Sequence, residues 1–130
     1  MFAGGPMATK IVVTVGDVAL EGELLDTRCG KALSALLPLE SAFSVWGDEF
    51  YFMVPLDCPL DDTATTHVSV GDIGFWPPGP ALAIFFGPTP MSTGSEPVPA
   101  SEVNIVGRLF GGATKLRSEK KAGLISITKA

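Results

Sequence analysis

The residue types that most often perform catalysis are scarce in this chain. Its 130 residues include one histidine, His67, and two cysteines, Cys29 and Cys58. A zinc centre normally needs several histidine or cysteine ligands at short spacings, and no CxxC motif occurs. Glycine-rich phosphate-binding motifs are also missing from the sequence. We therefore predict no metal site, no cofactor and no assignable catalytic residue, although an enzyme of unknown reaction remains open.

A stronger signal comes from a hairpin predicted between Ser41 and Val54, with Gly47 and Asp48 as its turn. A two-residue turn sets the register, so that one face pairs Val45 with Phe50 and Phe43 with Phe52 and must belong to the core.

The opposite face of this hairpin carries Trp46 beside Glu49, followed by Tyr51 and Met53. A sheet face in contact with water would not normally hold this many large apolar groups. Either a loop covers them or they bind a ligand, and the sequence leaves both interpretations open.

Further aromatic residues cluster around a proline-rich region. The stretch FWPPG begins at Phe75, and IFFGPTPM begins at Ile84, next to a long loop that starts at Gly87. Buried aromatics of a barrel wall would explain most of them, but some could line a groove together with Asn104 and Arg108, which are predicted to share one strand face. The candidate ligand-binding residues are Trp46, Glu49, Tyr51, Met53, Phe75, Trp76, Phe86, Met91, Asn104 and Arg108.

The elements that would position these residues are mostly short strands. Alternating and β-branched segments separated by glycine and proline predict about eight strands, and Leu33, Leu36 and Leu37 predict a short helix that ends at Pro38. Residues 87–101 show neither a helical nor a strand period, and 114–121 could add a helical turn. We predict an all-β fold, a closed eight-stranded antiparallel barrel with one or two short helices, although the count also allows an open sandwich.

Composition and charge narrow the classes of protein further. The chain is 46% hydrophobic with a net charge of −5, which argues against a disordered protein and against electrostatic binding of nucleic acid. Residues 32–107 contain nine carboxylates but no lysine or arginine. The length fits a single domain over residues 10–130, with residues 1–9 as a tail or as residues left from cloning.

No targeting or membrane signal is found in the sequence. The first residues lack the basic and apolar regions of a signal peptide. The longest uncharged run, from Ile73 to Ser95, contains five prolines, which a membrane helix would not tolerate. We therefore expect a cytoplasmic protein with two free, buried thiols and no membrane partner.

Three stretches carry a resemblance to a known family: SVWGDEFYF from Ser44, VGDIGFWPPGPALAIFFGPTPMS from Val70, and ASEVNIVGRLFG from Ala100. Together they resemble small prokaryotic proteins with a cyclophilin-like fold, a family largely of unassigned function, over nearly the whole chain from about Lys10 to Thr128. The resemblance implies an eight-stranded closed barrel with helices at its ends. A shared fold does not establish shared chemistry.

Three functions remain as hypotheses. The first is a non-enzymatic module that binds a small molecule or an extended peptide in an aromatic groove. The second is a weak prolyl isomerase that uses Arg108, because cyclophilins polarise the substrate amide with a strand arginine. The cyclophilin FHR…PGFM…QGGD-like stretch is missing, however, and residues 32–107 contain neither arginine nor glutamine. The third is an accessory domain or homo-oligomer whose aromatic surface is a subunit interface.

Overall fold

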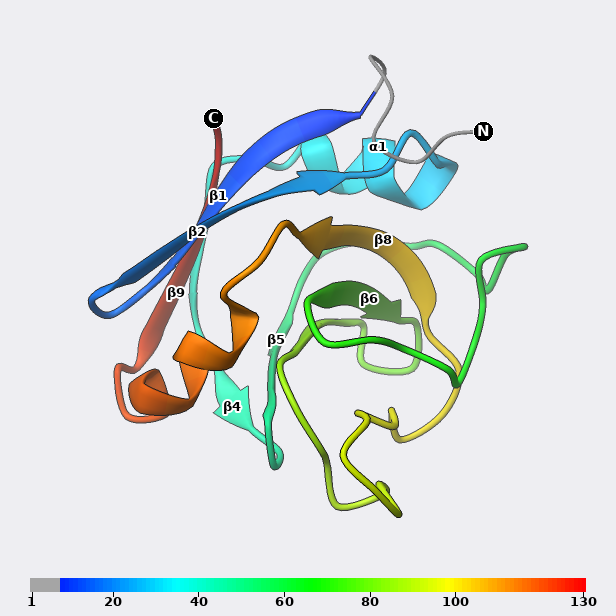
Figure 1. Ribbon diagram of the computed structural model, residues 1–130. Helices are drawn as coiled ribbons and strands as arrows, with labels where there is room; N and C mark the ends of the chain where they lie inside the picture. The colour runs from blue at the N-terminus through cyan, green and yellow to red at the C-terminus, as the bar shows by residue number, and fades with distance from the viewer. Residues whose placement is uncertain (1–7) are drawn as a thin grey trace.

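The computed structural model describes residues 8–130, which form nine strands, one α-helix and one 3-10 helix (Figure 1). The strands belong to one sheet in the order β3-β9-β1-β2-β8-β6-β7-β5-β4. They are β1 (Thr9–Val15), β2 (Val18–Leu24), β3 (Leu39–Ala42), β4 (Ser44–Val45), β5 (Glu49–Met53), β6 (Asp72–Trp76), β7 (Ala81–Phe85), β8 (Asn104–Leu109) and β9 (Leu124–Lys129). The helices are α1 (Arg28–Ser34) and η1 (Ala113–Glu119).

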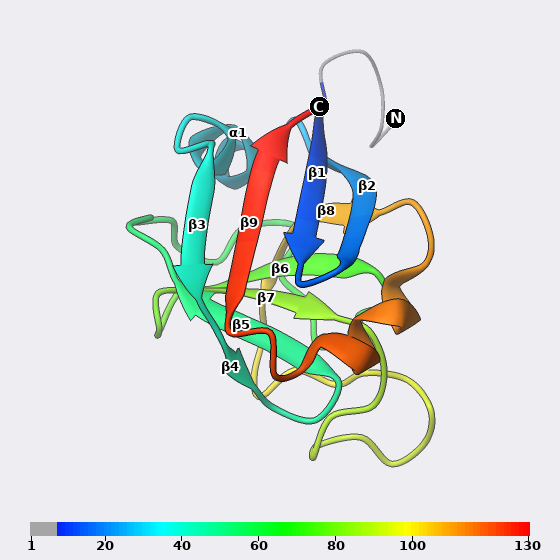
Figure 2. The ribbon, with the colours of Figure 1, turned by 90° about the vertical axis from the view of Figure 1, so that its left-hand side faces the viewer.

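The sheet curls into a nearly closed barrel because one bent segment supplies both of its edges. Only Phe43 separates β3 from β4, yet β3 pairs with β9 and β4 pairs with β5 (Figure 2). The predicted antiparallel all-β barrel is confirmed in outline. The count of eight strands and the full closure are corrected, because the bend at Phe43 divides the first strand of the predicted hairpin.

The predicted hairpin turn and part of its register are confirmed. Gly47 has a φ of +62°, which suits a residue without a Cβ, and Val45 lies opposite Phe50. The expected Phe43–Phe52 pair does not form, because the strand is interrupted at Phe43. The Phe43 ring instead packs on Phe50, with 4.3 Å between centroids, whereas Val45 is 40% exposed on the short edge strand.

Helix α1 begins after a side-chain cap at Thr27. The hydroxyl of Thr27 accepts a hydrogen bond from the backbone N–H of Gly30 at 3.0 Å. The helix ends at Ser34, earlier than expected, so Leu33 is buried in the core while Leu36 and Leu37 pack against it from the following turn. Neither helix among residues 8–130 is long and apolar enough to cross a membrane. Residues 1–7, which make up most of the predicted tail, lie outside the described part of the chain.

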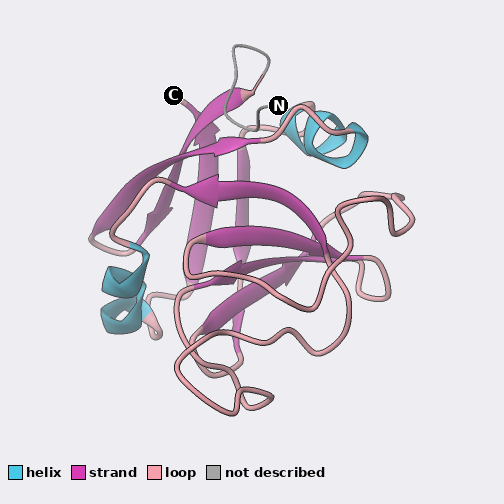
Figure 3. Cartoon of the chain, turned by 45° about the vertical axis from the view of Figure 1, so that its right-hand side comes forward, coloured by secondary structure: helices cyan, strands magenta, loops and turns pink. Residues whose placement is uncertain are grey.

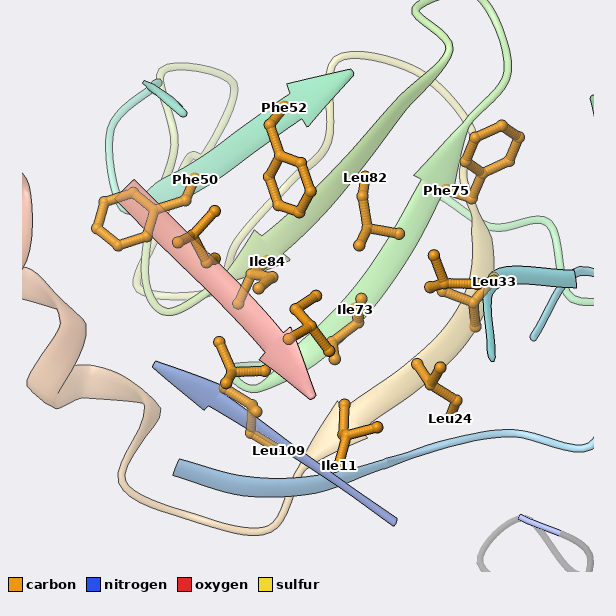
Figure 4. Packing of buried hydrophobic residues seen from close by; sticks show 14 of the residues in the cluster. Ile11, Leu24, Leu33, Phe50, Phe52, Ile73, Phe75, Leu82, Ile84 and Leu109 are labelled. Atoms are coloured by element: carbon orange, nitrogen blue, oxygen red, sulfur yellow. The ribbon is translucent and has the colours of Figure 1, made fainter. Parts of the chain in front are cut away.

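The core fills the inside of the barrel with side chains from alternate positions on each strand. Phe50 and Phe52 of β5, Leu82 and Ile84 of β7, and Ile73 and Phe75 of β6 point to this interior (Figure 4). The outward residues Ala83 and Phe85 of β7 form a second, smaller buried cluster with Val68 and Val103, on the outside of the barrel.

The two cysteines give a first test of this packing. Both are free and buried, and burial together with the neighbouring Cys58 thiol raises the pKa of Cys29 to about 12. Because the thiolate is the reactive form, we expect Cys29 to resist a disulfide reagent at about pH 8 in the native protein and to react once guanidinium unfolds the chain. Rapid labelling of native Cys29, followed by mass spectrometry, would contradict this packing.

Candidate functional site

A groove lies on the outer face of the sheet, where β5, β7 and β6 run side by side. Its volume is about 250 Å³. The long irregular segments of the chain gather on one side of the barrel (Figure 3), and residues 86–102, which contain no helix or strand, contribute one wall of the groove. The lining residues are Trp46, Glu49, Tyr51, Trp76, Ala81, Ala83, Phe85, Pro99, Ala100 and Val103.

The floor of the groove exists because the outward positions of β7 are small. Leu82 faces the core, whereas Ala81 and Ala83 face outward into the groove. Ala83 lies in register between Tyr51 on β5 and Gly74 on β6. The large side chain of Tyr51 therefore stands beside the methyl group of Ala83, which leaves a hollow over β7, whereas Val103 covers the backbone of Gly74.

One wall is fixed by a hydrogen bond between the sheet and the loop. The indole N–H of Trp76 donates to the hydroxyl of Ser101 at 2.6 Å. The loop is also braced internally, since the Thr89 hydroxyl donates to the Val98 carbonyl and the Ser92 hydroxyl donates to the Glu96 carbonyl at 2.6 Å. These bonds hold the segment that carries Pro99 and Ala100 in place against the sheet.

Asp48, in the hairpin turn, binds two basic side chains from the segment around η1. Its carboxylate forms ion pairs with Arg117 at 2.6 Å and with Lys120 at 2.8 Å. Burial alone would raise the pKa of Asp48, but hydrogen bonds from Lys120 and Arg117, together with their charges, outweigh that effect and hold the pKa below its usual value. The backbone N–H of Asp48 donates to the Pro88 carbonyl at 2.9 Å, which ties the turn to the loop.

Glu49, the next residue, lies in the groove without a partner. It is 7% exposed, and its Oε1 atom is buried with no hydrogen bond. Burial raises the pKa of Glu49 to about 7, because a carboxylate loses more hydration than a neutral acid does. None of the ion pairs formed among residues 8–130 involves Glu49. It is the one ionisable carboxyl group that lines the groove.

The structure brings together four of the ten candidate residues, namely Trp46, Glu49, Tyr51 and Trp76. Phe75 and Phe86 are fully buried in the barrel core instead, because they occupy inward positions. Met53 and Met91 are 61% and 52% exposed and do not line the groove.

Asn104 and Arg108 lie outside the groove, and a β-bulge places them on opposite faces of β8. The pairing of β6 with β8 shifts between Ile73 and Gly74, so Asn104 lies opposite the core residue Phe75, whereas Arg108 lies opposite Asp72. The expectation of a shared face was wrong, because even spacing preserves the face only in an unbroken strand.

Each of these two polar residues has a structural partner. Asn104 is fully buried; its side-chain amide donates to the Pro59 carbonyl at 2.9 Å and accepts from the Asp61 N–H at 2.8 Å. Arg108 donates to the buried Glu23 carboxylate at 3.0 Å. Neither side chain contributes to the groove.

The sequence interpretation missed six lining residues: Ala81, Ala83, Phe85, Pro99, Ala100 and Val103. One signal was present, because the segment from Ala81 to Phe86 is apolar at every position and so required cover on both faces. The alternate residues Ala81 and Ala83 of this segment are small, which indicates space above one face of the strand.

Comparisons with known proteins agree with this architecture. The sequence profile of the family described as Cyclophilin-like matches residues 9–128. The solution structure of a hypothetical protein from Archaeoglobus fulgidus is similar, with a TM-score of 0.77 and 27% identity over 95% of this chain and 96% of that chain. The search of curated proteins finds no match.

The unpaired carboxyl group predicts an unusual pH dependence of stability. The pKa of Glu49 rises from an ordinary 4.5 to about 7 on folding, so the folded state loses stability as the pH rises through that interval. Replacement of Glu49 by glutamine should therefore stabilise the protein at about pH 8 by up to about 3 kcal/mol and change little near pH 4. Urea unfolding of both proteins at the two pH values measures the difference.

Asp48 provides the matched control, because its folded-state pKa is lowered rather than raised. Its ion pairs stabilise the fold above the usual aspartate pKa, and this contribution disappears as the pH falls through the lowered value. Asp48→Asn should thus destabilise the protein at about pH 8, opposite in sign to Glu49→Gln. A Glu49→Gln protein that is less stable than the parent at this pH would show that the carboxyl group has a partner.

Proposed function

The chain belongs to the cyclophilin-like family, and we propose that it is a binding protein whose outer groove accepts a small molecule or one side chain of an extended peptide. The observation that carries this proposal is the hollow between Trp46, Tyr51 and Trp76 over the floor of Ala81 and Ala83. Sites for small ligands are concave and mostly apolar, with a few polar groups that orient the ligand. The groove has this composition, with Glu49 as its polar group.

The size of the groove limits what it can accept. A volume of about 250 Å³ lies just below the usual range for drug-sized ligands, so one compact group fills it. Met53, which is 61% exposed, continues the apolar surface of β5 beyond Tyr51 and the groove. A peptide could therefore place one side chain in the groove and rest its neighbours on this strand.

The alternative of prolyl isomerisation gains no support from the geometry. Arg108, the residue on which it depends, is bound to Glu23, and no arginine lines the groove. Electrostatic stabilisation of a twisting amide needs a donor at the bound substrate. A binding role requires no such group, and we therefore prefer it.

The two tryptophans of the chain provide a direct assay, because both line the groove. We expect small aromatic or branched apolar compounds, or blocked tripeptides with a large central residue, to change the tryptophan emission in the millimolar to micromolar range. Ala83→Leu should abolish the change, because its longer side chain fills the hollow from the floor while the core face of β7 stays intact.

Ala19→Leu is the control for Ala83→Leu, since Ala19 is an exposed residue on β2 and does not line the groove. This variant should bind as the parent does, and circular dichroism should show all three proteins folded. If no compound or peptide perturbs the emission of the parent, or if Ala83→Leu binds equally well, the groove is not the binding site.

A further inference from the structure

We infer that the ligand of this groove is a small organic ammonium ion, with its positive nitrogen beside Glu49 and its alkyl groups against Trp46, Tyr51 and Trp76. This inference rests on the proposed function, because it names the class of ligand that the same groove binds. Four features of the site carry it: an unsatisfied acceptor, an aromatic lining, the distribution of charge and the size of the hollow.

The acceptor is the carboxyl group of Glu49. This residue is only 7% exposed, and its Oε1 atom is buried without a hydrogen bond. Burial of an unpaired carboxylate is costly, and in folded proteins such groups normally have a hydrogen-bond or charged partner. Phe85 lies opposite Glu49 on β7 and offers no donor. A cation bound in the groove would supply the missing partner.

The aromatic lining favours a cation over a neutral group of the same shape. Trp46, Tyr51 and Trp76 line the groove together with Glu49. The π-electrons of such rings attract a positive charge, most strongly for tryptophan, and rings gathered around one site recognise alkylated ammonium groups. A carboxylate and three aromatic side chains thus act on the same ligand in the same direction.

The charges around the groove disfavour an anion as ligand, and no lysine or arginine side chain pairs with Glu49 in its place. All lining residues come from residues 46–103, within the part of the sequence that contains no lysine or arginine. The cations that approach from η1, Arg117 and Lys120, are both paired with Asp48. Tyr51 is the other ionisable side chain of the lining, and it carries no positive charge in either of its states.

The size of the hollow favours a free ion over the ammonium of a lysine side chain. The volume of about 250 Å³ accommodates a compact group with several alkyl substituents. Glu49, at the acidic end of the groove, is only 7% exposed. A bulky, multiply alkylated nitrogen presents apolar groups in several directions and so fills more of a hollow that three aromatic side chains line. A slender lysine side chain would leave much of the apolar lining unfilled.

Choline and its neutral carbon analogue 3,3-dimethylbutan-1-ol test this inference, since the two have nearly the same shape and differ in charge. We expect choline to change the tryptophan emission at about pH 8 with an affinity at least about tenfold higher than that of the alcohol. Glu49→Gln should weaken choline binding to the level of the alcohol and leave alcohol binding unchanged. Glu40→Gln, which removes an equal charge from an exposed position on β3, should bind choline as the parent does.

The same titration has a second readout that a merely structural role of Glu49 would not give. Since the bound cation favours the carboxylate, choline should lower the pKa of Glu49 in a carbon-detected NMR titration. Choline affinity should fall by up to about tenfold per unit as the pH drops below about 7, until the lowered pKa of the complex is reached. The alcohol should shift neither quantity.

The outcomes separate this inference from the proposed function. Equal binding of choline and the alcohol, both insensitive to Glu49→Gln and both lost in Ala83→Leu, would overturn the ammonium assignment while the binding function stands. Binding of a blocked lysine or trimethyl-lysine peptide at least about tenfold tighter than choline would overturn the assignment to a free ion. Loss of every response, for apolar compounds as well as for choline, would overturn the proposed function itself.

Discussion

The alternation of side chains along β5, β6 and β7 is the constraint on which both the core and the groove depend. Each strand places one set of residues inside the barrel and the next set outside, so Phe50 and Leu82 fill the core while Tyr51 and Ala83 shape the groove. A register shift of one residue would exchange the two sets. The interior that holds the fold together therefore also holds the groove in its geometry.

The turn that precedes β5 separates two neighbouring carboxyl groups into different environments. Asp48 and Glu49 are adjacent in the sequence, yet one meets Arg117 and Lys120 and the other meets the apolar lining. Their pKa values move in opposite directions as a result. Because Arg117 and Lys120 both pair with Asp48 at the turn, neither of them neutralises the carboxyl group of Glu49 in the groove.

These relations explain which parts of the structure could be predicted from the sequence. The hairpin turn at Gly47 and the grouping of Trp46, Glu49 and Tyr51 follow from local pattern, since a two-residue turn fixes the register of its strands. The bend at Phe43 and the bulge near Ile73 depend on how distant strands meet around the barrel. No local pattern encodes these two irregularities, and they account for the extra strand and for the misplacement of Asn104 and Arg108.

The presence of Glu49 in the groove lowers the stability of the folded protein. Its neighbour across the ladder, Phe85, and the aromatic lining around it give it no compensation, so the folded protein is less stable above neutral pH than it would be with a neutral residue there. A neutral side chain of similar size would remove this cost without any change in the strand pairing. Residues that violate the rules of stable packing without local compensation gather at functional sites, where a ligand supplies the missing interaction. The unpaired carboxyl group is therefore the feature that distinguishes this groove from an ordinary hollow in the barrel wall.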